Sequence, residues 1–562
     1  MKILSINLGI NGGIAFMENG KILKHTSFHK INVGTSIGKL SSDTLTNFLG
    51  GTEIRVDELD YIVFAGYDKD MIGLPHFDFV VDPEFRLTPL SAFQEHGKER
   101  KTVFHLPSLL PPYTDRPYNY VTGYVIYNQL VVPSLIVSPD MCHSSIGYFT
   151  SEFVNSINIT VSYNDYTIYD GSSVSVSESN EMTVVNRPKI SVGKLYPKMT
   201  ELLGFGSGYF NHTTISDISP RFNDEEYNGV IDEGVNNHLS DIRDNYELTL
   251  FNEVTKHKVI QKLDKFRMLP YYSYDEESFG NKFVLKMASI CQKVIENTVI
   301  DLITNSIKNY SPNFTRNITL SGETFLNRRL NTKILNKFKD YNIHISPLTE
   351  SQSMSLGGAL YVNSLYGTRR RYHRDFLLSN SHYINDMINN GPEINYEELS
   401  DVLDGNMISF HYKSPECTKK SMGHTGFIFD VSNDEYSKRK DKLCKELFSK
   451  PCVVVLEESY GKHFIVDEYT FNNNTISKPN LPHLFKDFIH DDGYVNIFVI
   501  NEVTNPSLFN IIKKTGREYI GLCDYNTDKF RSIYHNDTLF TLSSDVEVKF
   551  IIIDDKLHKI EE

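Results

Sequence analysis

A strand, a glycine and a helix follow one another near residue 322, in an order typical of phosphate-binding turns. Residues 318–320 predict a strand that passes into Ser321 and Gly322, and the segment that holds Asn327 and Asn331 predicts a helix. Glycine permits close approach of the backbone, and the first turn of a helix offers N–H donors without partners. We therefore predict that Gly322, Asn327 and Asn331 contact a nucleotide. A packed strand-to-helix turn without a ligand is the alternative.

A second glycine-rich turn lies at the N-terminus. Residues 3–6 and 14–16 predict the strands of a hairpin, which glycines at positions 9, 12 and 13 interrupt. Phosphate-binding hairpins of the actin/hexokinase type begin in this way, because their backbone N–H groups approach the anion closely. The N-terminus is therefore typical of that fold class, although hairpins that bind nothing share the pattern.

The composition is that of a globular protein. The chain has 562 residues, of which 40% are hydrophobic and 23% charged, and its formal net charge is −14. Duplex nucleic acid is bound by clustered Lys and Arg side chains that neutralise phosphates, so this balance argues against a general duplex-binding surface. We interpret the densest basic cluster, Arg369, Arg370, Arg371 and Arg374, as a solvated segment between domains. A phosphate-binding role for this cluster is the alternative.

Cysteine usage and hydropathy indicate the compartment. Six cysteines are scattered along the chain without a C-x-x-C pair, which predicts neither a disulfide framework nor a zinc knuckle. The N-terminal apolar stretch is too short and too interrupted for a signal peptide, and no later segment supplies the roughly 18 continuous apolar residues of a membrane span. We expect a soluble, cytoplasmic protein in a reducing environment, without a membrane partner.

Periodicity predicts two α/β bodies along the chain. Residues 120–170 alternate as strands do, and residues 283–307 repeat apolar side chains at helical spacing. Residues 372–392 lack periodicity, and we place the domain boundary there. Buried strands beyond it are predicted at residues 407–412, 452–456 and 496–501. The predicted fold class is α/β, with a larger body in front and a smaller one behind.

Four segments keep the order and spacing of one set of family motifs. Residues 191–205 match S-x-G-x-x-Y-x-x-x-T-x-x-L-G-F, and residues 144–149 match the run that follows a pair of metal-binding histidines. Residues 321–331 match A-G-G-x-x-L-N-x-x-x-N and lead into residues 356–359, which match the helix start A-L-G-A-A. In residues 404–430, the signature E-F-G-P-R-A-L-G-N-R-S and its continuation are matched by Glu416, Gly423 and Asp430. Together these segments resemble the nodulation and antibiotic-tailoring O-carbamoyltransferases.

The resemblance implies two domains with separate tasks. Residues 1–372 would form an actin/hexokinase-type front domain, similar to the universal tRNA threonylcarbamoyl transferase, which binds a nucleotide and a metal. Residues 393–562 would form a YrdC-like rear domain that joins carbamoyl phosphate to ATP. The resulting carbamoyl-adenylate would modify a hydroxyl in the front domain. This chemistry needs cations at the phosphates, and a metal or donor set that polarises the carbamoyl carbonyl.

The family's metal motif, H-x-x-x-H, is only partly present. Its second histidine corresponds to His143 and its first to Pro139, while Asp140 lies on the same predicted helical face as an oxygen donor. Two family aspartates correspond to Ser162 and Ser351. The resemblance predicts a divalent metal held by His143 and Asp140, with His143 in a catalytic role. A histidine packed in the core is the alternative.

The rear motifs have also lost charged residues. The signature arginine corresponds to Lys420, which keeps the charge but loses the bidentate fork, and the second arginine corresponds to Thr425. Of the family's N-T-S-F-N motif, Asn501 and Asn505 remain. The resemblance predicts phosphate contacts from Lys419, Lys420 and Asn501, with Lys420 in a catalytic role. A solvated lysine pair is the alternative.

Three functional hypotheses follow. The first is an O-carbamoyltransferase that uses ATP and carbamoyl phosphate to modify a hydroxyl of a small metabolite or nucleotide. The second is a catalytically degenerate homologue that acts as a structural or regulatory partner of an active carbamoyltransferase, in a homo- or hetero-oligomer. The third is a nucleotide-binding protein without transfer chemistry.

Overall fold

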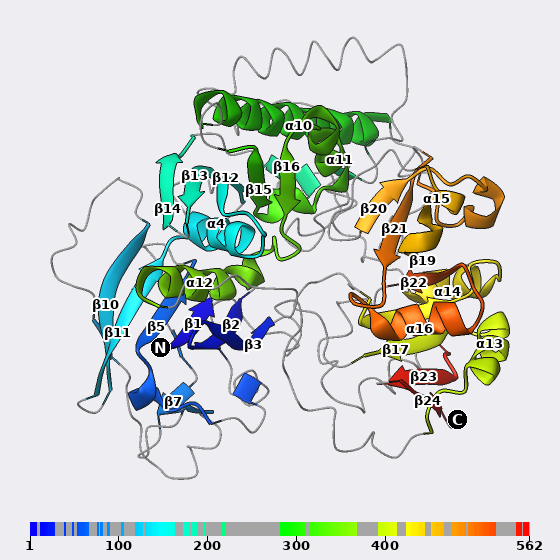
Figure 1. Cartoon of the computed structure of the whole chain (residues 1–562), viewed down its shortest axis with the longest axis horizontal. Helices are drawn as coiled ribbons and strands as arrows, with labels where there is room; N and C mark the ends of the chain where they lie inside the picture. The colour runs from blue at the N-terminus through cyan, green and yellow to red at the C-terminus, as the bar shows by residue number, and fades with distance from the viewer. Residues whose placement is uncertain are drawn as a thin grey trace.

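The structure is a computed structural model of the chain, and Figure 1 shows its course from end to end. Within the described residues, three main sheets of seven, five and eight strands organise the fold. We call residues 1–367 the front body and residues 392–560 the rear body. The described residues are 1–7, 12–27, 39–40, 48–49, 53–66, 76–77, 79–81, 87–89, 103–105, 119–127, 130–162, 172–179, 181–188, 193, 195–196, 199–200, 215–216, 219, 282–310, 315–367, 392–412, 423–443, 451–465, 474–490, 493–523, 547–553 and 555–560.

The first sheet has the strand order β3-β2-β1-β5-β11-β10-β9. β1 pairs antiparallel with β2 and parallel with β5, and β5 pairs parallel with β11. The strands are β1 (Lys2–Asn7), β2 (Gly13–Glu18), β3 (Lys21–Ser27), β5 (Tyr61–Ala65), β9 (Val103–His105), β10 (Tyr120–Tyr127) and β11 (Leu130–Val137). Two small sheets pair β4 (Lys39–Leu40) with β6 (His76–Phe77) and β7 (Phe79–Val81) with β8 (Leu87–Pro89). The N-terminal hairpin that was predicted from the glycines is confirmed.

The second sheet repeats the central order of the first. Its order is β14-β13-β12-β15-β16, with β12 antiparallel to β13 and parallel to β15, and β15 parallel to β16. The strands are β12 (Asn155–Val161), β13 (Ser172–Glu178), β14 (Glu181–Asn186), β15 (Asn317–Ser321) and β16 (Asn342–Ile345). Three antiparallel strands beside two parallel ones, twice in one chain, make the duplicated architecture of the actin/hexokinase type. The predicted fold class is confirmed.

Two helices, α4 (Pro139–Phe149) and α12 (Met354–Tyr366), pack against each other between these sheets (Figure 1). Their close approach depends on a glycine pair, since a Cβ on Gly357 would overlap the carbonyl of Cys142. A Cβ on Gly358 would lie only 2.8 Å from Cβ of Ala65, which holds α12 against the first sheet. The prediction of strands throughout residues 120–170 was wrong for α4. Proline at the first helical position after Ser138 starts this helix between two strands.

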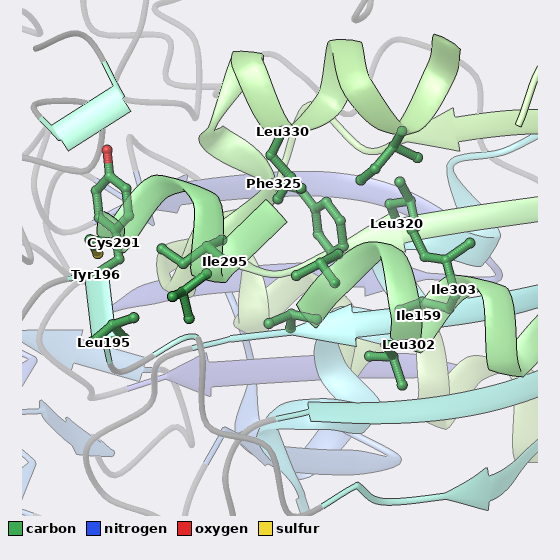
Figure 2. Packing of buried hydrophobic residues seen from close by; sticks show 14 of the residues in the cluster. Ile159, Leu195, Tyr196, Cys291, Ile295, Leu302, Ile303, Leu320, Phe325 and Leu330 are labelled. Carbon is green, nitrogen blue, oxygen red and sulfur yellow. The ribbon is translucent and has the colours of Figure 1, made fainter. Parts of the chain in front are cut away.

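The outer face of the second sheet is covered by α10 (Lys282–Tyr310) and α11 (Arg328–Lys337). Figure 2 shows Ile295, Leu302 and Ile303 of α10 packed with Ile159 and Leu320 of the sheet. This helix was predicted from its apolar spacing. The same core includes Leu195, Tyr196 and Met199, which belong to the first family segment. The described residues of that segment therefore serve packing.

The rear body is an eight-stranded mixed sheet with the order β20-β21-β19-β22-β18-β17-β23-β24. Its strands are β17 (Ile408–His411), β18 (Thr425–Phe429), β19 (Cys452–Leu456), β20 (Asn474–Ser477), β21 (Val495–Ile500), β22 (Tyr519–Cys523), β23 (Phe550–Ile553) and β24 (Lys556–Lys559). Its helices are α13 (Tyr396–Gly405), α14 (Glu435–Leu443), α15 (Tyr460–His463) and α16 (Pro506–Lys514). The three predicted strands correspond to β17, β19 and β21. The predicted boundary at residues 372–392 lies almost wholly outside the described residues, as does the arginine cluster.

No helix in the described part of the chain is both long and apolar enough to cross a membrane.

Candidate functional site

The carboxyl ends of β1, β12 and β15 meet at one place in the front body. Asn7, the last residue of β1, donates through Nδ2 to the carbonyl of Ser351 at 2.7 Å. Ser351 Oγ donates to Oε1 of Glu323, which follows β15. Ser162, which follows β12, lies beside the turn at the end of β15. We call this place the strand-end junction and define it by Asn7, His143, Ser162, Glu323 and Ser351.

His143 enters the junction from α4 and is fully buried. Its Nε2 lies 3.6 Å from Oε1 of Glu323, and neither ring nitrogen has a hydrogen-bond partner among the described residues. Burial lowers the pKa of His143 below its usual value, and the negative charges of Glu323 and Asp140 offset this only in part. The imidazole is therefore neutral at physiological pH, with nitrogen atoms to offer to a ligand.

Glu323 supplies the carboxylate of the junction, and its role was not predicted from the sequence. The residue is 3% exposed, and its Oε2 has no hydrogen-bond partner in the described part of the chain. His143 Nε2 lies near its Oε1, and this contact would be an ion pair only with the imidazole protonated. In the motifs of the resemblance, Glu323 corresponds to the second glycine of A-G-G-x-x-L-N and Ser351 to an aspartate.

Both carboxylate oxygens of Asp140 accept hydrogen bonds from other residues of the front body. Its Oδ1 accepts from Ser138 Oγ at 2.5 Å, and its Oδ2 accepts from Arg187 Nε at 2.8 Å. Arg187 also donates to Asn119 Oδ1 at 2.8 Å, so the carboxylate ties the start of α4 to neighbouring chain segments. Within the described residues, no group of three or more His, Cys, Asp or Glu side chains is arranged to hold a metal ion. A metal held by His143 and Asp140 stays a prediction.

Gly322 has a structural reason to be glycine. Its φ of +97° lies in the region that side-chain-bearing residues avoid, and a Cβ would overlap the carbonyl of Val161 at the end of β12. The turn brings the ends of β12 and β15 into direct contact. Substitution of Gly322 would therefore disturb the fold as well as any ligand contact.

Asn327 and Asn331 are buried and hydrogen-bonded within the turn that follows β15. Asn327 caps α11, where its Oδ1 accepts from the backbone N of Leu330 at 3.1 Å, and its Nδ2 donates to Gln292 Oε1 at 2.8 Å. Asn331 Nδ2 donates to the carbonyl of Phe325 at 2.8 Å. Both amides support the 3₁₀ turn η4 (Glu323–Leu326) and the start of α11. Their contact with a nucleotide stays a prediction.

Hydroxyl groups connect α4 to the second sheet below the junction. Ser144 Oγ is 2.8 Å from Thr160 Oγ1, which is 3.1 Å from Ser321 Oγ, and all three residues are fully buried. A second set of buried hydroxyls surrounds Asn158, which bonds to Ser156, Ser175, Ser177 and Thr319. This face of the sheet is polar, whereas the face under α10 is apolar. We call these residues the hydroxyl layer.

In the rear body, Asn501 lies at the carboxyl end of β21. Its Oδ1 accepts from the backbone N of Val503 and Thr504 at 3.0 and 2.9 Å. Its Nδ2 donates to Glu457 Oε2, at the end of the parallel strand β19, at 3.1 Å. The predicted phosphate ligands Lys419 and Lys420 lie outside the described residues.

Gly423 and Asp430, two other positions of the rear body that match the motifs of the resemblance, each contact another residue of the rear body. A Cβ on Gly423 would lie 2.7 Å from Nδ2 of Asn505, so the signature segment and the remnant of N-T-S-F-N are neighbours. Asp430 accepts from Arg517 Nε at 3.0 Å, and Arg517 also bonds to Ser400 and Asp404 of α13. Arg517 therefore links α13 to Asp430 at the end of β18.

No protein-family model and no curated protein matches this chain. Solved structures with similarity include a ROK family protein from Streptococcus pneumoniae TIGR4 in complex with sucrose, at 15% identity and a TM-score of 0.26, covering 65% of this chain and 98% of that one. A ROK family glucokinase from Streptomyces griseus in complex with glucose and AMPPNP has 11% identity and a TM-score of 0.23, with 64% and 99% covered. Full-length HypF in its phosphate- and nucleotide-bound form has 11% identity and a TM-score of 0.30; 65% of this chain matches 47% of HypF, about half its length. The fold class rests on the strand order of the two sheets.

Proposed function

We propose that the chain is an O-carbamoyltransferase-like protein that uses carbamoyl phosphate and ATP, through a carbamoyl-adenylate, to modify a hydroxyl of a small metabolite or nucleotide. The observation that carries the proposal is the strand-end junction. It gathers residues of α4, of the turn after β15 and of the segment before α12, all of which belong to the motifs of the resemblance. In open α/β sheets, ligands bind outside the carboxyl ends of the strands.

In this proposal the junction receives the carbamoyl end of the adenylate. The nucleotide contacts come from the backbone at Gly322, and Asn327 and Asn331 support that turn from behind. A divalent metal would polarise the carbamoyl carbonyl toward attack by the acceptor hydroxyl. His143 and Glu323 fit such an ion, because both are buried, hold donor atoms without hydrogen-bond partners among the described residues, and offer ligand types that divalent metals accept.

The rear body would prepare the adenylate: water would release phosphate from carbamoyl phosphate, and the carbamate formed would displace pyrophosphate from ATP. AMP would leave when the acceptor hydroxyl is carbamoylated in the front body. In the rear body, Lys419, Lys420 and Asn501 are the proposed phosphate contacts. Of the matched positions that the structure describes, Gly423 and Asn505 are neighbours. A lysine is a point charge and orients a phosphate less firmly than a guanidinium fork. Loss of a well-placed contact of this kind costs on the order of 3 kcal/mol, or about a hundredfold in rate. We therefore expect slow adenylate formation by the isolated chain.

The second candidate function is a degenerate homologue that assists an active carbamoyltransferase subunit. The observation that favours it is that polar side chains at the predicted sites form hydrogen bonds with other residues of this chain. Asp140 is held by Arg187, Asn327 by Gln292, and Asn501 by Glu457. A companion subunit would then supply the missing cationic contacts.

Pyrophosphate release from ATP, measured with and without carbamoyl phosphate, separates these candidates. For the enzyme we expect slow release that depends on carbamoyl phosphate and falls about tenfold or more in Lys420→Ala, because a phosphate contact is lost. The control variant is Lys513→Ala, whose side chain is half exposed and paired with Glu458. Absence of release with any divalent metal would contradict the enzyme and leave the degenerate partner or a nucleotide-binding protein without transfer chemistry.

A further inference from the structure

Helix α11 of the front body carries only positive charges. Its sequence holds four cations and no carboxylate: Arg328, Arg329, Lys333 and Lys337. One side of the helix is buried against the second sheet, and Lys333 and Lys337 are exposed on the other. Arg329, Lys333 and Lys337 follow at intervals of four residues and form a row about 12 Å long. We call the four cations the basic face.

Helix α13 of the rear body has the opposite charge. It holds four exposed carboxylates and no cation: Glu397, Glu398, Asp401 and Asp404. Its apolar side is buried in the core of the rear body. Glu397, Asp401 and Asp404 lie at positions i, i+4 and i+7, which share one side of a helix and span about 10 Å. We call the four carboxylates the acidic face.

Neither face is explained by the stability of its own helix. Like charges four residues apart destabilise a helix, and both faces contain such pairs. Arg328 and Arg329 occupy the first turn of α11, and Asp404 the last turn of α13, where the helix dipole disfavours their charges. Opposite charges from outside each helix would offset this cost.

The chain itself compensates the two faces only in part. Lys333 pairs with the buried Glu296, and Asp404 pairs with Arg517. The ammonium of Lys337 lies over the ring of Phe338 and forms no ion pair among the described residues. The same holds within the described part of the chain for the carboxylates of Glu397 and Asp401. Each face therefore keeps charge that a partner can neutralise.

The two helices of one chain lie apart. α11 lies against β20, which forms one edge of the rear sheet. The segment before α13 pairs at Glu393 with Lys556 of β24, which forms the opposite edge. In Figure 1, α11 lies beside β20, and α13 lies near β23 and β24. The basic face can therefore meet the acidic face only in a second copy.

We propose that copies of this chain associate head to tail, with the basic face of α11 in one copy against the acidic face of α13 in the next. The two faces match in charge, and their rows of about 12 and about 10 Å bring three residues opposite three. The two surfaces differ, so each copy can join a neighbour on both sides, in a ring or an extended assembly. The inference goes beyond the proposed function and does not depend on it.

An interface of this kind is sensitive to salt. Ion pairs between exposed side chains are screened when the Debye length falls from about 10 Å at 0.1 M salt to about 3 Å at 1 M. Sedimentation velocity of the full chain measures the association. We expect an average mass above that of the monomer at about 0.1 M NaCl, rising with protein concentration, and a monomer at about 1 M.

Charge reversal at either face tests the pairing. The first variant is Arg328→Glu, Lys337→Glu on α11. The second is Glu397→Lys, Asp401→Lys on α13. Both spare the charges that have ion-pair partners within the chain. Each variant alone should associate at least about tenfold more weakly than the wild type, because it presents two faces of like charge.

A mixture of the two reversed variants should assemble again. The reversed α11 of the first variant then meets the reversed α13 of the second, and the two unchanged faces also match. The control is Lys21→Glu, Lys308→Glu, which changes the net charge as the α11 variant does, at exposed positions of β3 and α10. It should associate like the wild type.

Circular dichroism would verify that each variant is folded. Arg328→Gln, Lys337→Gln and Glu397→Gln, Asp401→Asn replace a reversed variant that does not fold, and they too should weaken association. A wild type that is monomeric at low salt would overturn the proposal and leave α11 to a different polyanion. Association that persists in both folded variants, or no recovery in their mixture, would also overturn it.

Discussion

Lys24 is a buried lysine outside the strand-end junction. Its titration makes the free energy of unfolding depend on pH. Its Nζ donates to the carbonyl of Phe48 at 3.0 Å and to that of Leu49, and burial lowers its pKa from 10.5 to about 8. The folded protein therefore releases this proton at a lower pH than the unfolded chain does. Between these two values the unfolded state binds more protons, so the stability contribution of Lys24 rises with pH.

We predict that the free energy of unfolding of the wild type, relative to Lys24→Met, increases from pH 8 to pH 10. The slope should approach about 1 kcal/mol per pH unit, the limit for one proton being close to 1.4. Urea unfolding of both proteins at several pH values measures it. Lys21→Met, at an exposed position of the same strand, should show no such slope relative to the wild type. A flat difference for Lys24→Met would show that the amine stays protonated in the folded state.

Residue types near the junction were predictable from the sequence, but the direction of each side chain was not. Asn327 and Asn331 follow a strand and a glycine, as residues that contact nucleotides do, yet their amides bond to Gln292 and Phe325. Spacing along one helix does not reveal a partner on a distant helix such as α10. The role of Glu323 was not predicted because it depends on the hydrogen bond that Ser351 donates to it. This bond forms only when β15 and the segment before α12 pack together.

At the scale of elements, α4 and α12 approach each other closely at a glycine of α12. Gly357 faces the backbone carbonyl of Cys142, which has no freedom to move aside as a flexible side chain would. We predict that Gly357→Ala lowers the free energy of unfolding by about 1–3 kcal/mol, because overpacking forces the helices apart. Thermal unfolding followed by circular dichroism measures the loss.

The matched glycine for this test is Gly405, at the end of α13, where an added Cβ would have no neighbour within 4 Å. Gly405→Ala should leave the unfolding temperature nearly unchanged. Equal effects of the two substitutions would mean that the α4–α12 contact relaxes without cost.

The long helix α10 was predictable from its period, whereas at α4 the composition indicated a strand and only the family's H-x-x-x-H motif indicated a helix. The 29 residues of α10 repeat apolar side chains at helical spacing, so the sequence indicated the helix directly. α4 is buried over its 11 residues and carries Ser144 and Gly147 toward the second sheet. With only 11 residues between two strands, this helix gives a short signal, and its small polar residues resemble those of the neighbouring strands.

At the scale of the whole molecule, the duplicated sheet order explains why the fold class followed from so few signals. Each half needs a hairpin, two parallel strands and a covering helix, and two glycines with positive φ, Gly66 after β5 and Gly322 after β15, mark corresponding places. In the rear body the sequence shows short apolar runs, which predict strands but not the order of those strands in the sheet. The order β20-β21-β19-β22 arises from contacts that are distant in sequence.

In the rear body, Arg517 joins parts of the chain that are far apart. It bonds to Asp430 after β18 and to Ser400 and Asp404 of α13, and its side chain is 10% exposed. We predict that Arg517→Met lowers the free energy of unfolding by about 3 kcal/mol, because Asp430 loses its charged partner in a mostly buried site. Lys513→Met, which breaks an exposed pair with Glu458, should cost less than about 1 kcal/mol. Similar losses in both variants, measured by urea unfolding, would contradict this difference.

The hydroxyl layer has a further consequence, for the heat capacity of the protein. Apolar surface raises the heat capacity when it becomes exposed on unfolding, whereas polar surface lowers it. The second sheet buries apolar residues under α10 but serine, threonine and asparagine under α4. The two faces of the second sheet therefore contribute with opposite sign to the heat-capacity change of unfolding. This half of the front body gains less heat capacity on unfolding than a sheet of equal area with two apolar faces would. Its stability accordingly changes less steeply with temperature, on the cold side as well as on the warm side.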